Sequence, residues 1–479
     1  MGLKGHVVKN PMNVLTDEEV KRIHYGALEV LERTGVVFNH KKALEILDDA
    51  GCSVDHKKEL VRFPSYLAEE SLRKCPRRVL LKGRTPEYDV VIGDPYLHFS
   101  SCPAMDMLDL ETNDRKTPTA QDYANVVKTL DYLDEVHIVN VPYLHLKGVL
   151  GLVLYPEILH IELTNTQKGI ILAGLHGNEV WCIKMAQATG QSLLAYLECA
   201  PPLTWGEDQV DSTLHFIEAG FPVLPGTGLA TGGTSPVTLA GALVQQLAEI
   251  MAITVLIQIV KPGAGIVAKS RIEPMDMRTG EIAEGGVEKV IADAAWNQIW
   301  RWYGIPRFHT IVTTDSKVPD YQCGMEKALH YLLSALTGSN LITGVGSVYD
   351  ELTSSPVVAI MDNELIRRVH RIIDGVEVNE ESLAVDLINE VGPIPGHFLN
   401  REHTRRLFQS ELLRPELADR FSYGEWKKAG KKTNFDYAKE KYEHIMATHE
   451  PKPLPEDQKK AIDEILEEAR AFYKEKEKL

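Results

Sequence analysis

The stretch from residue 170 to residue 226 decides the fold class, because short apolar runs alternate in it with helix-length amphipathic segments. It contains IILAG (170–174), NEVWCIKMAQAT (178–189), LAYLE (194–198), DQVDSTLHFIEA (208–219) and PVLPG (222–226). Short apolar runs of this kind are typical of strands that are buried on both faces. Strands that alternate with helices predict a parallel sheet whose strands are joined by right-handed crossovers.

The same alternation extends in both directions, from about residue 91 to about residue 376. The predicted strands are Tyr96–Ser100, His137–Val141, Ile170–Gly174, Leu194–Glu198, Pro222–Gly226, Gly265–Lys269, Phe308–Thr313 and Leu341–Val345. The predicted helices between and after them are Ala120–Leu133, Asn178–Thr189, Asp208–Ala219, Pro236–Ile259, Glu284–Tyr303, Met325–Leu336 and Ser355–Ile373. Eight strand–helix units over roughly 280 residues match a closed (β/α)₈ barrel in size. The alternative is an open doubly wound sheet, but the GxGxxG motif that usually follows its first strand is missing near Tyr96.

Two flanking regions complete the predicted organisation. Residues 1–90 form a helical N-terminal region, in which Thr16 and Glu19 have the spacing of a capping box and Gly35 is a plausible helix stop. Residues 91–376 form the catalytic barrel. Residues 377–479 form a helical, strongly charged C-terminal extension, interrupted by PKPLP at 451–455. The surface of this extension is a candidate for homo-oligomer formation or for partner docking.

Composition narrows the class of protein. The chain has 479 residues, 44% of them hydrophobic, and a formal net charge of −16 without any basic block. Nucleic acid and anionic membrane surfaces are therefore poor partners. Six cysteines without a CxxC pair are typical of reduced thiols in a cytoplasmic protein. The apolar stretch 236–260 contains three glutamines and a glutamate, so it predicts a buried helix and not a membrane span.

Carboxylates stand at the ends of two predicted strands. In a barrel of this class, residues at the carboxyl ends of the strands face the active site. Glu198 ends the fourth strand and Asp315 follows the seventh. Because a buried charge is costly unless it is paired, an acid at this place usually faces a ligand, a metal or a basic partner. We take Glu198 and Asp315 as candidate catalytic residues, with a salt bridge from Asp315 to Lys317 as the alternative.

Aromatic residues recur at the same predicted edge. Phe99, Tyr143, Trp205 and Tyr349 are candidate substrate-binding residues, because aromatic faces attract quaternary ammonium groups with roughly 0.5–2 kcal/mol each. The alternative is that each ring packs in the core or in a loop.

Glycines follow the fifth predicted strand in the run GTGLATGGT (226–234), just before a helix. Such a loop can cradle an anion, but the arrangement GxxxxGK[ST] is missing, so nucleotide binding has little support. His176, Glu179 and Cys182 drift around a helix at their spacing, and no second cluster completes a zinc site. We therefore expect no metal ion of the protein's own.

Several long motifs, in order along nearly the whole chain, carry a resemblance to a known family. They are LTDEEVKRIHYGALEVLERTGV (15–36), PRRVLLKGR (76–84), MDMLDLETNDRKTPT (105–119), SPVTLAGA (235–242), DMRTG (276–280), TDSKVPD (314–320), MDNELIRRVHRI (361–372), REHTRRLFQSELLRPELADRFSYGEWKKAG (401–430) and PKPLP (451–455). In these the chain resembles the trimethylamine methyltransferase family, including members that lack pyrrolysine and act on betaines. The resemblance implies a barrel that transfers a methyl group from an amine to the cobalt of a cognate corrinoid protein, as part of one-carbon metabolism.

The resemblance also bears on the substrate. Trimethylamine enzymes of the family carry pyrrolysine, whereas this chain reads in the standard twenty residues. A quaternary amine suits such a chain better, because Co(I) is a strong nucleophile and the leaving tertiary amine is neutral and needs no proton. Orientation and desolvation then suffice for catalysis. Glycine betaine is the first expectation; proline betaine, carnitine, butyrobetaine and trimethylamine itself are the alternatives.

The partner and the remaining contacts follow from the same reasoning. No DxHxxG-type corrinoid signature occurs in the chain, so we expect the corrinoid to arrive on a partner protein, with Gly226, Thr227 and Gly228 in a loop that faces it. A betaine carboxylate would need donors, for which His309, Lys269 and backbone NH groups near Thr227 are candidates. Two rivals stay open: a corrinoid-independent hydrolase or lyase that uses the two carboxylates as acid and base, and a non-enzymatic binding protein.

Overall fold

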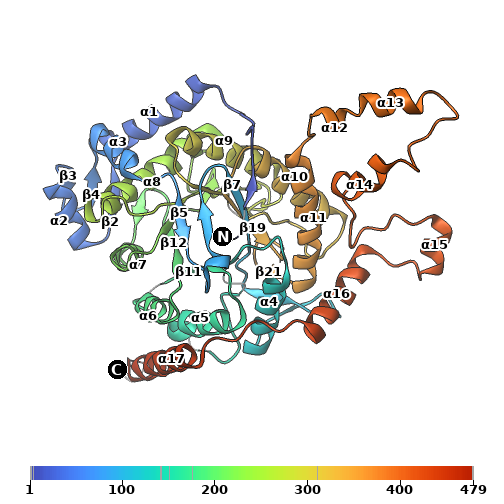
Figure 1. Cartoon of the computed structure of the whole chain (residues 1–479). Coiled ribbons are helices and arrows are strands. Elements are labelled where there is room, and N and C mark those ends of the chain that lie inside the picture. The colour runs from blue at the N-terminus through green and yellow to red at the C-terminus, as the bar shows by residue number, and fades with distance from the viewer. Residues whose placement is uncertain are drawn as a thin grey trace.

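Eight parallel strands form a barrel at the centre of the structure, a computed structural model that describes residues 3, 5–109, 111–140, 143–149, 151–174, 176–309 and 311–476 (Figure 1). They are β7 (Tyr96–Ser101), β10 (Ile138–Asn140), β11 (Gly169–Ala173), β12 (Leu193–Cys199), β14 (Val223–Thr227), β16 (Ala268–Lys269), β18 (Arg307–His309) and β19 (Leu341–Val345). Their order is β14-β12-β11-β10-β7-β19-β18-β16, and a parallel bridge from Val223 to Ile266 joins the two ends of this row. The predicted (β/α)₈ barrel is confirmed. Val141 and Thr310, which two predicted strands include, lie outside the described residues.

A helix follows each barrel strand. These helices are α4 (Ala120–Tyr132), α5 (Leu154–Asn165), α6 (Glu179–Thr189), α7 (Glu207–Glu218), α8 (Leu239–Val260), α9 (Val287–Tyr303), α10 (Tyr321–Leu336) and α11 (Pro356–Asp374). Seven of them match predicted helices, but α5 has no predicted counterpart. Helix α5 packs against α4, α6 and α17 (Glu456–Lys476), so its apolar residues do not keep to a single face, and a single-face pattern is the signal that reveals a helix in a sequence.

The amino-terminal half of the barrel is filled with apolar side chains. One core cluster joins Ile138, Ile171, Leu194, Leu224, Val267, Phe308 and Leu341 to four residues of the hairpin β5 (Val79–Leu81) and β6 (Val90–Ile92). The hairpin therefore plugs the amino-terminal end. The opposite end, formed by the carboxyl ends of the strands and the loops that follow them, is called the mouth below.

Helix α8 carries the most apolar stretch of the chain. It is long and apolar enough to cross a membrane, but 78% of its most apolar 18-residue window is buried in the protein. It packs against α1 (Asp17–Arg33) and α3 (Ser65–Lys74) of the N-terminal region. The prediction of a buried core helix is confirmed.

The N-terminal region contains the predicted helices and also strands that were not predicted. Thr16 and Glu19 form the predicted capping box at the start of α1. After it come α2 (Lys41–Asp49) and three short strands, β2 (Val36–Phe38), β3 (Ser53–Asp55) and β4 (Leu60–Arg62), which form a sheet with β13 (Thr204–Trp205). Strands of three residues are too short to show an alternating pattern in a sequence.

Further short strands pair outside the barrel sheet or at its margin. They are β1 (His6–Val7), β8 (Asp106–Leu108), β9 (Arg115–Lys116), β15 (Leu229–Thr231), β17 (Ile272–Pro274), β20 (Ser347–Val348) and β21 (Thr353–Ser354). Strand β15, in the glycine-rich run, pairs with β17. This pairing holds two loops of the mouth side by side.

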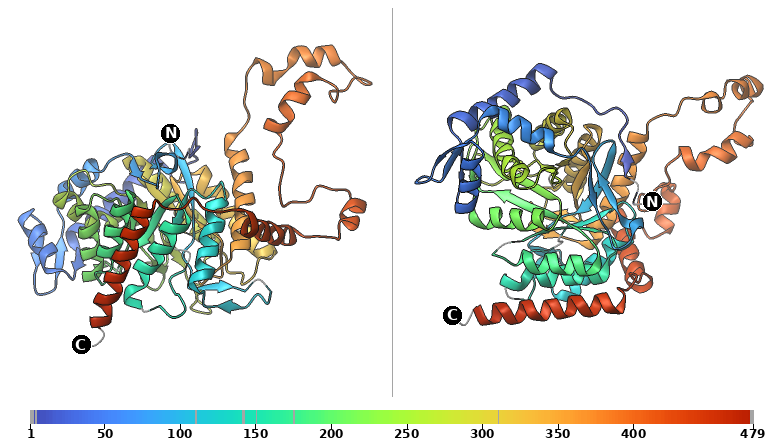
Figure 2. Two further views of the ribbon diagram at one scale, coloured as in Figure 1. Left: turned by 60° about the horizontal axis from the view of Figure 1, so that its bottom comes forward. Right: turned by 60° about the vertical axis from the view of Figure 1, so that its left-hand side comes forward.

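The C-terminal extension is helical, as predicted. Its helices before α17 are α12 (Glu380–Leu383), α13 (Val385–Val391), α14 (Glu402–Glu411), α15 (Tyr423–Lys428) and α16 (Asn434–Thr448). Figure 2 shows α12 to α15 projecting away from the barrel as an arm, while α17 lies along the barrel surface. Val376, Ile394 and Leu399 on the arm are 86–95% exposed. Self-association or partner docking would cover these side chains; the boundaries at residues 90 and 376 stay predictions.

A buried ion pair holds the loop that follows β19. Lys327 of α10 donates to Asp362 of α11 (2.6 Å) and to the carbonyl of Ser347 (2.8 Å). The same carboxylate accepts from the backbone N–H of Gly346 (2.8 Å). Two helices thereby fix the start of a loop that leads into the mouth.

We expect Asp362→Ala to lower the free energy of unfolding by about 3–5 kcal/mol, because it leaves the buried Lys327 ammonium without its counter-charge. Urea denaturation followed by circular dichroism measures the change. Glu464→Gln, which breaks the exposed pair Lys460–Glu464, is the control and costs less than about 1 kcal/mol. Equal losses for the two variants would contradict this account.

Candidate active site

A cavity of about 190 Å³ lies at the mouth. Its lining comes from residues at or beyond the ends of several strands: Pro103, Asn140, Leu144, Tyr155, Ala173, Tyr196, Glu198, Arg271 and Glu351. The volume is below the roughly 300–1,000 Å³ of pockets for drug-sized ligands. The cavity therefore suits a small molecule, and its wall combines two phenol rings with two carboxylates and one guanidinium.

Glu198 lies at the centre of the hydrogen bonds of this wall. Its carboxylate accepts from the hydroxyl of Tyr196 (2.8 Å) and forms an ion pair with Lys269, whose side chain is fully buried. Burial, reinforced by the charge of Arg271, lowers the pKa of Lys269 well below its usual value. A Cβ on Gly226 would lie 2.5 Å from Cδ of Lys269. The glycine at the end of β14 thus makes room for the buried lysine.

Arg271 faces several carboxylates at once. It forms ion pairs with Glu273, with Glu351 (3.5 Å) and with Glu198 (3.6 Å). Burial opposes its charge, but Glu351 and Glu273 raise the pKa of Arg271 well above its usual value. Lys269, Arg271 and Glu273 alternate along the chain, as expected for side chains that share one face of an extended segment.

The charges around the cavity do not balance. Four carboxylates lie close to three cations at the mouth. The carboxylates are those of Glu198, Glu273, Glu284 and Glu351, and the cations are Lys269, Arg271 and Lys289. These seven residues are called the mouth cluster. Burial raises the pKa of Glu284 well above its usual value, and the neighbouring carboxylates add to the shift. Because an uncompensated buried charge is costly, the mouth cluster favours either an extra proton or a bound cation.

Two acidic residues, Asp350 and Glu351, lie in a loop with a strained backbone. Tyr349, Asp350 and Glu351 have φ values of 49°, 51° and 65°, in the left-handed region that costs a non-glycine residue roughly 1–2 kcal/mol. Backbone N–H groups of Tyr349 and Asp350 donate to the carbonyls of Ser316 (3.0 Å) and Thr314 (3.1 Å). Strain of this kind concentrates at functional sites, and here it points Glu351 into the cavity.

The predicted catalytic acids have separate environments. Glu198 lines the cavity, whereas Asp315 is paired with Asp350, whose pKa is raised to about 8 by burial and by the hydrogen bond and charge of Asp315. The alternative bridge to Lys317 is not formed with the carboxylate, since the Lys317 ammonium donates to the backbone carbonyl of Asp315 (2.6 Å).

The Asp315–Asp350 pair predicts a pH-dependent stability. Folded Asp350 keeps its proton up to about pH 8, while the unfolded chain releases it near 3.8, so the free energy of unfolding falls as the pH rises between these values. Asp350→Asn cannot titrate, and we expect it to be more stable than the parent above pH 8 by about 1–2 kcal/mol, allowing for partial exposure. Denaturation midpoints from pH 5 to pH 9 test this; parallel profiles of the two proteins would contradict it.

Three predicted aromatic residues pack away from the cavity. The ring of Phe99 is buried against Tyr331, with ring centroids 6.0 Å apart. The ring of Tyr143 is buried against Tyr123 at 6.0 Å. Trp205 is buried and donates its ring N–H to the Glu249 carbonyl of α8 (3.1 Å). The structure brings none of these three rings to the cavity wall.

Tyr349 and His309, the other two predicted substrate-binding residues, contact side chains of the protein and do not line the cavity. The Tyr349 ring lies beneath two cations of the protein itself, Lys317 (4.7 Å) and Arg115 (5.5 Å). His309 is fully buried behind the barrel wall, 3.4 Å from the carboxylate of Asp293. The cavity's own phenol rings are those of Tyr155 and Tyr196, and the Lys269 ammonium lies 3.7 Å from the centroid of the Tyr196 ring.

Four charged or aromatic residues of the wall were not predicted: Tyr155, Tyr196, Arg271 and Glu351. Tyr196 had a usable signal, because it stands two positions before Glu198 and therefore on the same face of β12. Arg271 had the same signal relative to Lys269. Tyr155 begins α5, the helix without a single apolar face, and Glu351 depends on the left-handed loop.

Three carboxylates of the mouth cluster lie close enough together to hold a metal ion. Glu273, Glu284 and Glu351 place oxygens within 4.8 Å of one another, but Arg271 and Lys289 already pair with these acids. The set predicted not to bind zinc is dispersed, since His176 pairs with Asp208 (2.8 Å) and Glu179 with His215 (2.8 Å).

Comparison with known proteins places this barrel in a family. The profile described as trimethylamine methyltransferase (MTTB) matches residues 4–472. Trimethylamine methyltransferase MttB of Desulfitobacterium hafniense is 30% identical, over 96% of this chain and 94% of the relative. MttB of Methanosarcina thermophila is 31% identical, over 93% and 95%. A glycine betaine methyltransferase of D. hafniense is 29% identical, over 92% and 94%. The chain is therefore a methyltransferase that belongs to the trimethylamine methyltransferase family.

Proposed function

We propose that this protein transfers a methyl group from a small quaternary amine, glycine betaine first among them, to a corrinoid carried by a partner protein. The N–C bond breaks with its electron pair left on nitrogen, so the product is neutral dimethylglycine nitrogen and no proton is required. The Co(I) of the partner's corrinoid supplies the electron pair of the new bond to the methyl group. The observation that carries the proposal is the acidic, tyrosine-lined cavity at the mouth.

The cavity suits a permanent cation. Tyr155 offers a ring face for cation–π contact, and Glu198 and Glu351 supply negative charge beside it. One face of the Tyr196 ring already meets the Lys269 ammonium, 3.7 Å from the ring centroid, so only its other face is left for a ligand. A bound ammonium group would neutralise the excess charge of the mouth cluster without protonation of a carboxylate. A trimethylammonium group cannot donate a hydrogen bond from nitrogen, so ring faces and net charge are the means by which a protein recognises it.

Arg271 is the proposed contact for the betaine carboxylate. Its Nη1 and Nη2 atoms lie 3.6 and 3.5 Å from Glu198 and Glu351, longer than ordinary hydrogen bonds. Guanidinium N–H groups can thus turn to a ligand carboxylate, with which arginine forms bidentate pairs. His309 is buried outside the cavity and Lys269 is engaged by Glu198, so Arg271 replaces these two earlier candidates.

The mouth fits a methyl acceptor that comes from outside. Side chains of Glu198 and Arg271 keep 29% and 25% of their surface exposed, so the cavity is reached through the mouth. A Cβ on Gly228 would lie 3.5 Å from Arg271 and 3.6 Å from Glu198, which puts this backbone at the edge of the cavity. Gly228 therefore remains the proposed corrinoid-facing residue. Gly226 and Thr227, predicted with it, are buried in the barrel.

The role of the protein's own residues is to bind, orient and desolvate. The Tyr155 ring and the carboxylates hold the ammonium group, Arg271 fixes the other end of the molecule, and one methyl group is left pointing out of the mouth. Holding two reactants in this way lowers the entropic part of the barrier. Acid–base catalysis by Glu198 is not needed for this reaction.

Spectroscopy of cobalt tests the proposal. The protein is incubated with Co(I) cobalamin, free and on a carrier protein, and with glycine betaine, proline betaine, carnitine, butyrobetaine or trimethylamine. Loss of the Co(I) absorption with a quaternary amine is expected. Its persistence with every amine and both acceptors would contradict the proposal; turnover without corrinoid would favour a hydrolase or lyase, and tight binding without transfer would favour a binding protein.

A further inference from the structure

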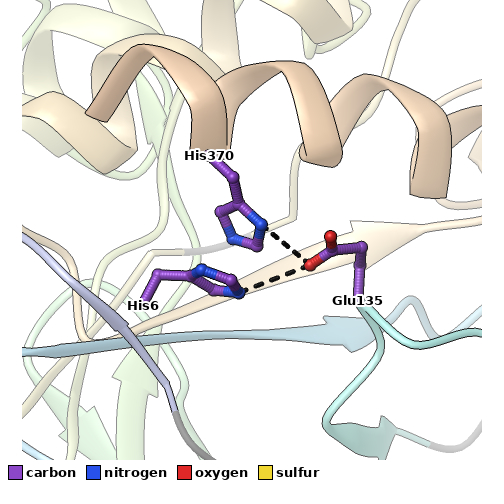
Figure 3. Close-up of side chains that lie close together, drawn as sticks. All are labelled: His6, Glu135 and His370. Carbon is purple, nitrogen blue, oxygen red and sulfur yellow. Dashed lines mark ion pairs between the residues drawn. The ribbon is translucent and has the colours of Figure 1, made fainter. Parts of the chain in front are cut away.

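A second cluster of ionisable side chains lies at the opposite end of the barrel from the cavity. His6 is on β1, Glu135 lies between α4 and β10, and His370 is in the last turns of α11 (Figure 3). Strand β1 pairs with the first residues of β7, His6 opposite Leu97. Because the mouth is at the other end of β7, this cluster is separate from the proposed active site.

The three side chains converge on one point. Nδ1 of His370 lies 2.9 Å and Nε2 of His6 lies 3.4 Å from Oε2 of Glu135. Their ligand atoms all lie within 4.8 Å of one another. A tetrahedral ion bound at 2.0–2.2 Å holds its ligand atoms about 3.3–3.6 Å apart. The His6 and His370 rings lie nearly face to face, with centroids 2.8 Å apart, so an ion fits among these atoms once one of the two rings rotates away from the other.

The chemistry of the set is that of a transition-metal site. Two imidazoles and one carboxylate are ligands that Zn²⁺ accepts. Within the described residues, both ion pairs of Glu135 are with these histidines and neither is with Lys or Arg. The mouth carboxylates differ in this respect, because Arg271 and Lys289 form ion pairs with Glu273 and Glu284.

The surroundings make the site rigid on two sides and open on the third. Side chains of Glu135 and His370 are 11% and 8% exposed, and Asn363 of α11 accepts from the backbone N–H of Glu135 (3.1 Å). His6 keeps 27% of its side chain exposed, which leaves access for an ion and for a water molecule as fourth ligand.

We propose that His6, Glu135 and His370 bind one divalent transition-metal ion, of which Zn²⁺ is the best fit. The ion joins three parts of the chain that are more than a hundred residues apart and fastens the N-terminal strand to the amino-terminal end of the barrel. The active sites of such barrels lie at the other end, at the carboxyl ends of the strands, so the proposed role of the ion is structural.

Metal binding by the full chain tests the proposal. Protein stripped with a chelator is titrated with Co²⁺, whose visible absorption reports tetrahedral ligation, and then with competing Zn²⁺. One equivalent is expected to bind and to raise the melting temperature, because the ion binds the folded state alone. His370→Ala and Glu135→Gln should weaken binding by at least about 100-fold, since even outer-shell changes cost 10–100-fold.

Matched variants keep the outcome decisive. His160→Ala breaks a pair with Asp463 (2.6 Å), a histidine–carboxylate contact without a third ligand, and should bind metal as the parent does. His6→Gln, on a partly exposed strand, serves if His370→Ala does not fold. Absence of a bound equivalent, or unchanged affinity in His6→Gln, would overturn the proposal. Loss of binding in Glu273→Gln alone would also overturn it, by placing the ion at the mouth.

Discussion

Glu198→Gln is expected to raise KM for glycine betaine about 100-fold while kcat changes little. A carboxylate about 4 Å from an ammonium group contributes about 4 kcal/mol at an effective dielectric constant near 20, and partial exposure of Glu198 reduces this to roughly 2.7 kcal/mol, a factor of about 100. The nitrogen loses its positive charge as the methyl group departs, so it is less positive in the transition state than in the bound substrate. The carboxylate therefore favours the bound substrate at least as much as the transition state, and its loss falls on KM.

An analogue that lacks the ammonium charge separates charge from shape in this experiment. 3,3-Dimethylbutyrate replaces the ammonium nitrogen of glycine betaine by carbon, so the parent should bind it far more weakly than betaine, whereas Glu198→Gln should bind the two alike. Glu281→Gln is the control, because Glu281 is exposed and does not line the cavity. A KM for betaine unchanged in Glu198→Gln would remove this residue from the ammonium site.

The barrel could be predicted because its strands carry a local signal. Strands such as Leu193–Cys199 are buried on both faces, so they read as apolar runs in any context. Helix α5 was missed for the opposite reason: neighbours on several sides remove the single-face pattern. The short strands β2 to β4 have too few residues to show any period.

The site was predictable only where position along a strand decides orientation. Glu198 follows from the rule that strand ends face the mouth. The prediction of Phe99 did not take into account that successive residues of a strand point to opposite faces. Phe99 follows this alternation along β7 and packs outward, against Tyr331. Applied to β12, the same alternation would have selected Tyr196.

Contacts created by loops or by distant segments had no local signal. Glu351 reaches the cavity through three successive left-handed residues, a conformation that neither Tyr349 nor Glu351 favours and that Asp adopts only as a single residue. His6, Glu135 and His370 meet only once the barrel is closed. Such sites depend on tertiary packing, which residue spacing does not encode.

Arg271→Gln is expected to weaken the binding of glycine betaine and to strengthen the binding of tetramethylammonium. Loss of the guanidinium removes the proposed donor to the betaine carboxylate and raises the negative excess of the mouth cluster by one charge. Betaine should therefore lose about 100-fold in affinity, within the 2–5 kcal/mol typical of a broken buried charge pair, while tetramethylammonium, which has no carboxylate, should bind more tightly than it does to the parent. Isothermal titration calorimetry with both ligands measures the crossover.

Two further variants separate charge from geometry at Arg271. Arg271→Lys keeps the positive charge but lacks the planar fork of donors, so it should lose much of the betaine affinity without gaining affinity for tetramethylammonium. Arg278 is exposed and paired with Asp276, so Arg278→Gln should leave the affinity for both ligands unchanged. If Arg271→Gln weakened both ligands equally, the guanidinium would be supporting the cavity wall and not reading the carboxylate. A gain for tetramethylammonium that is reversed by adding Glu198→Gln would instead tie substrate choice to the charge balance of the mouth cluster.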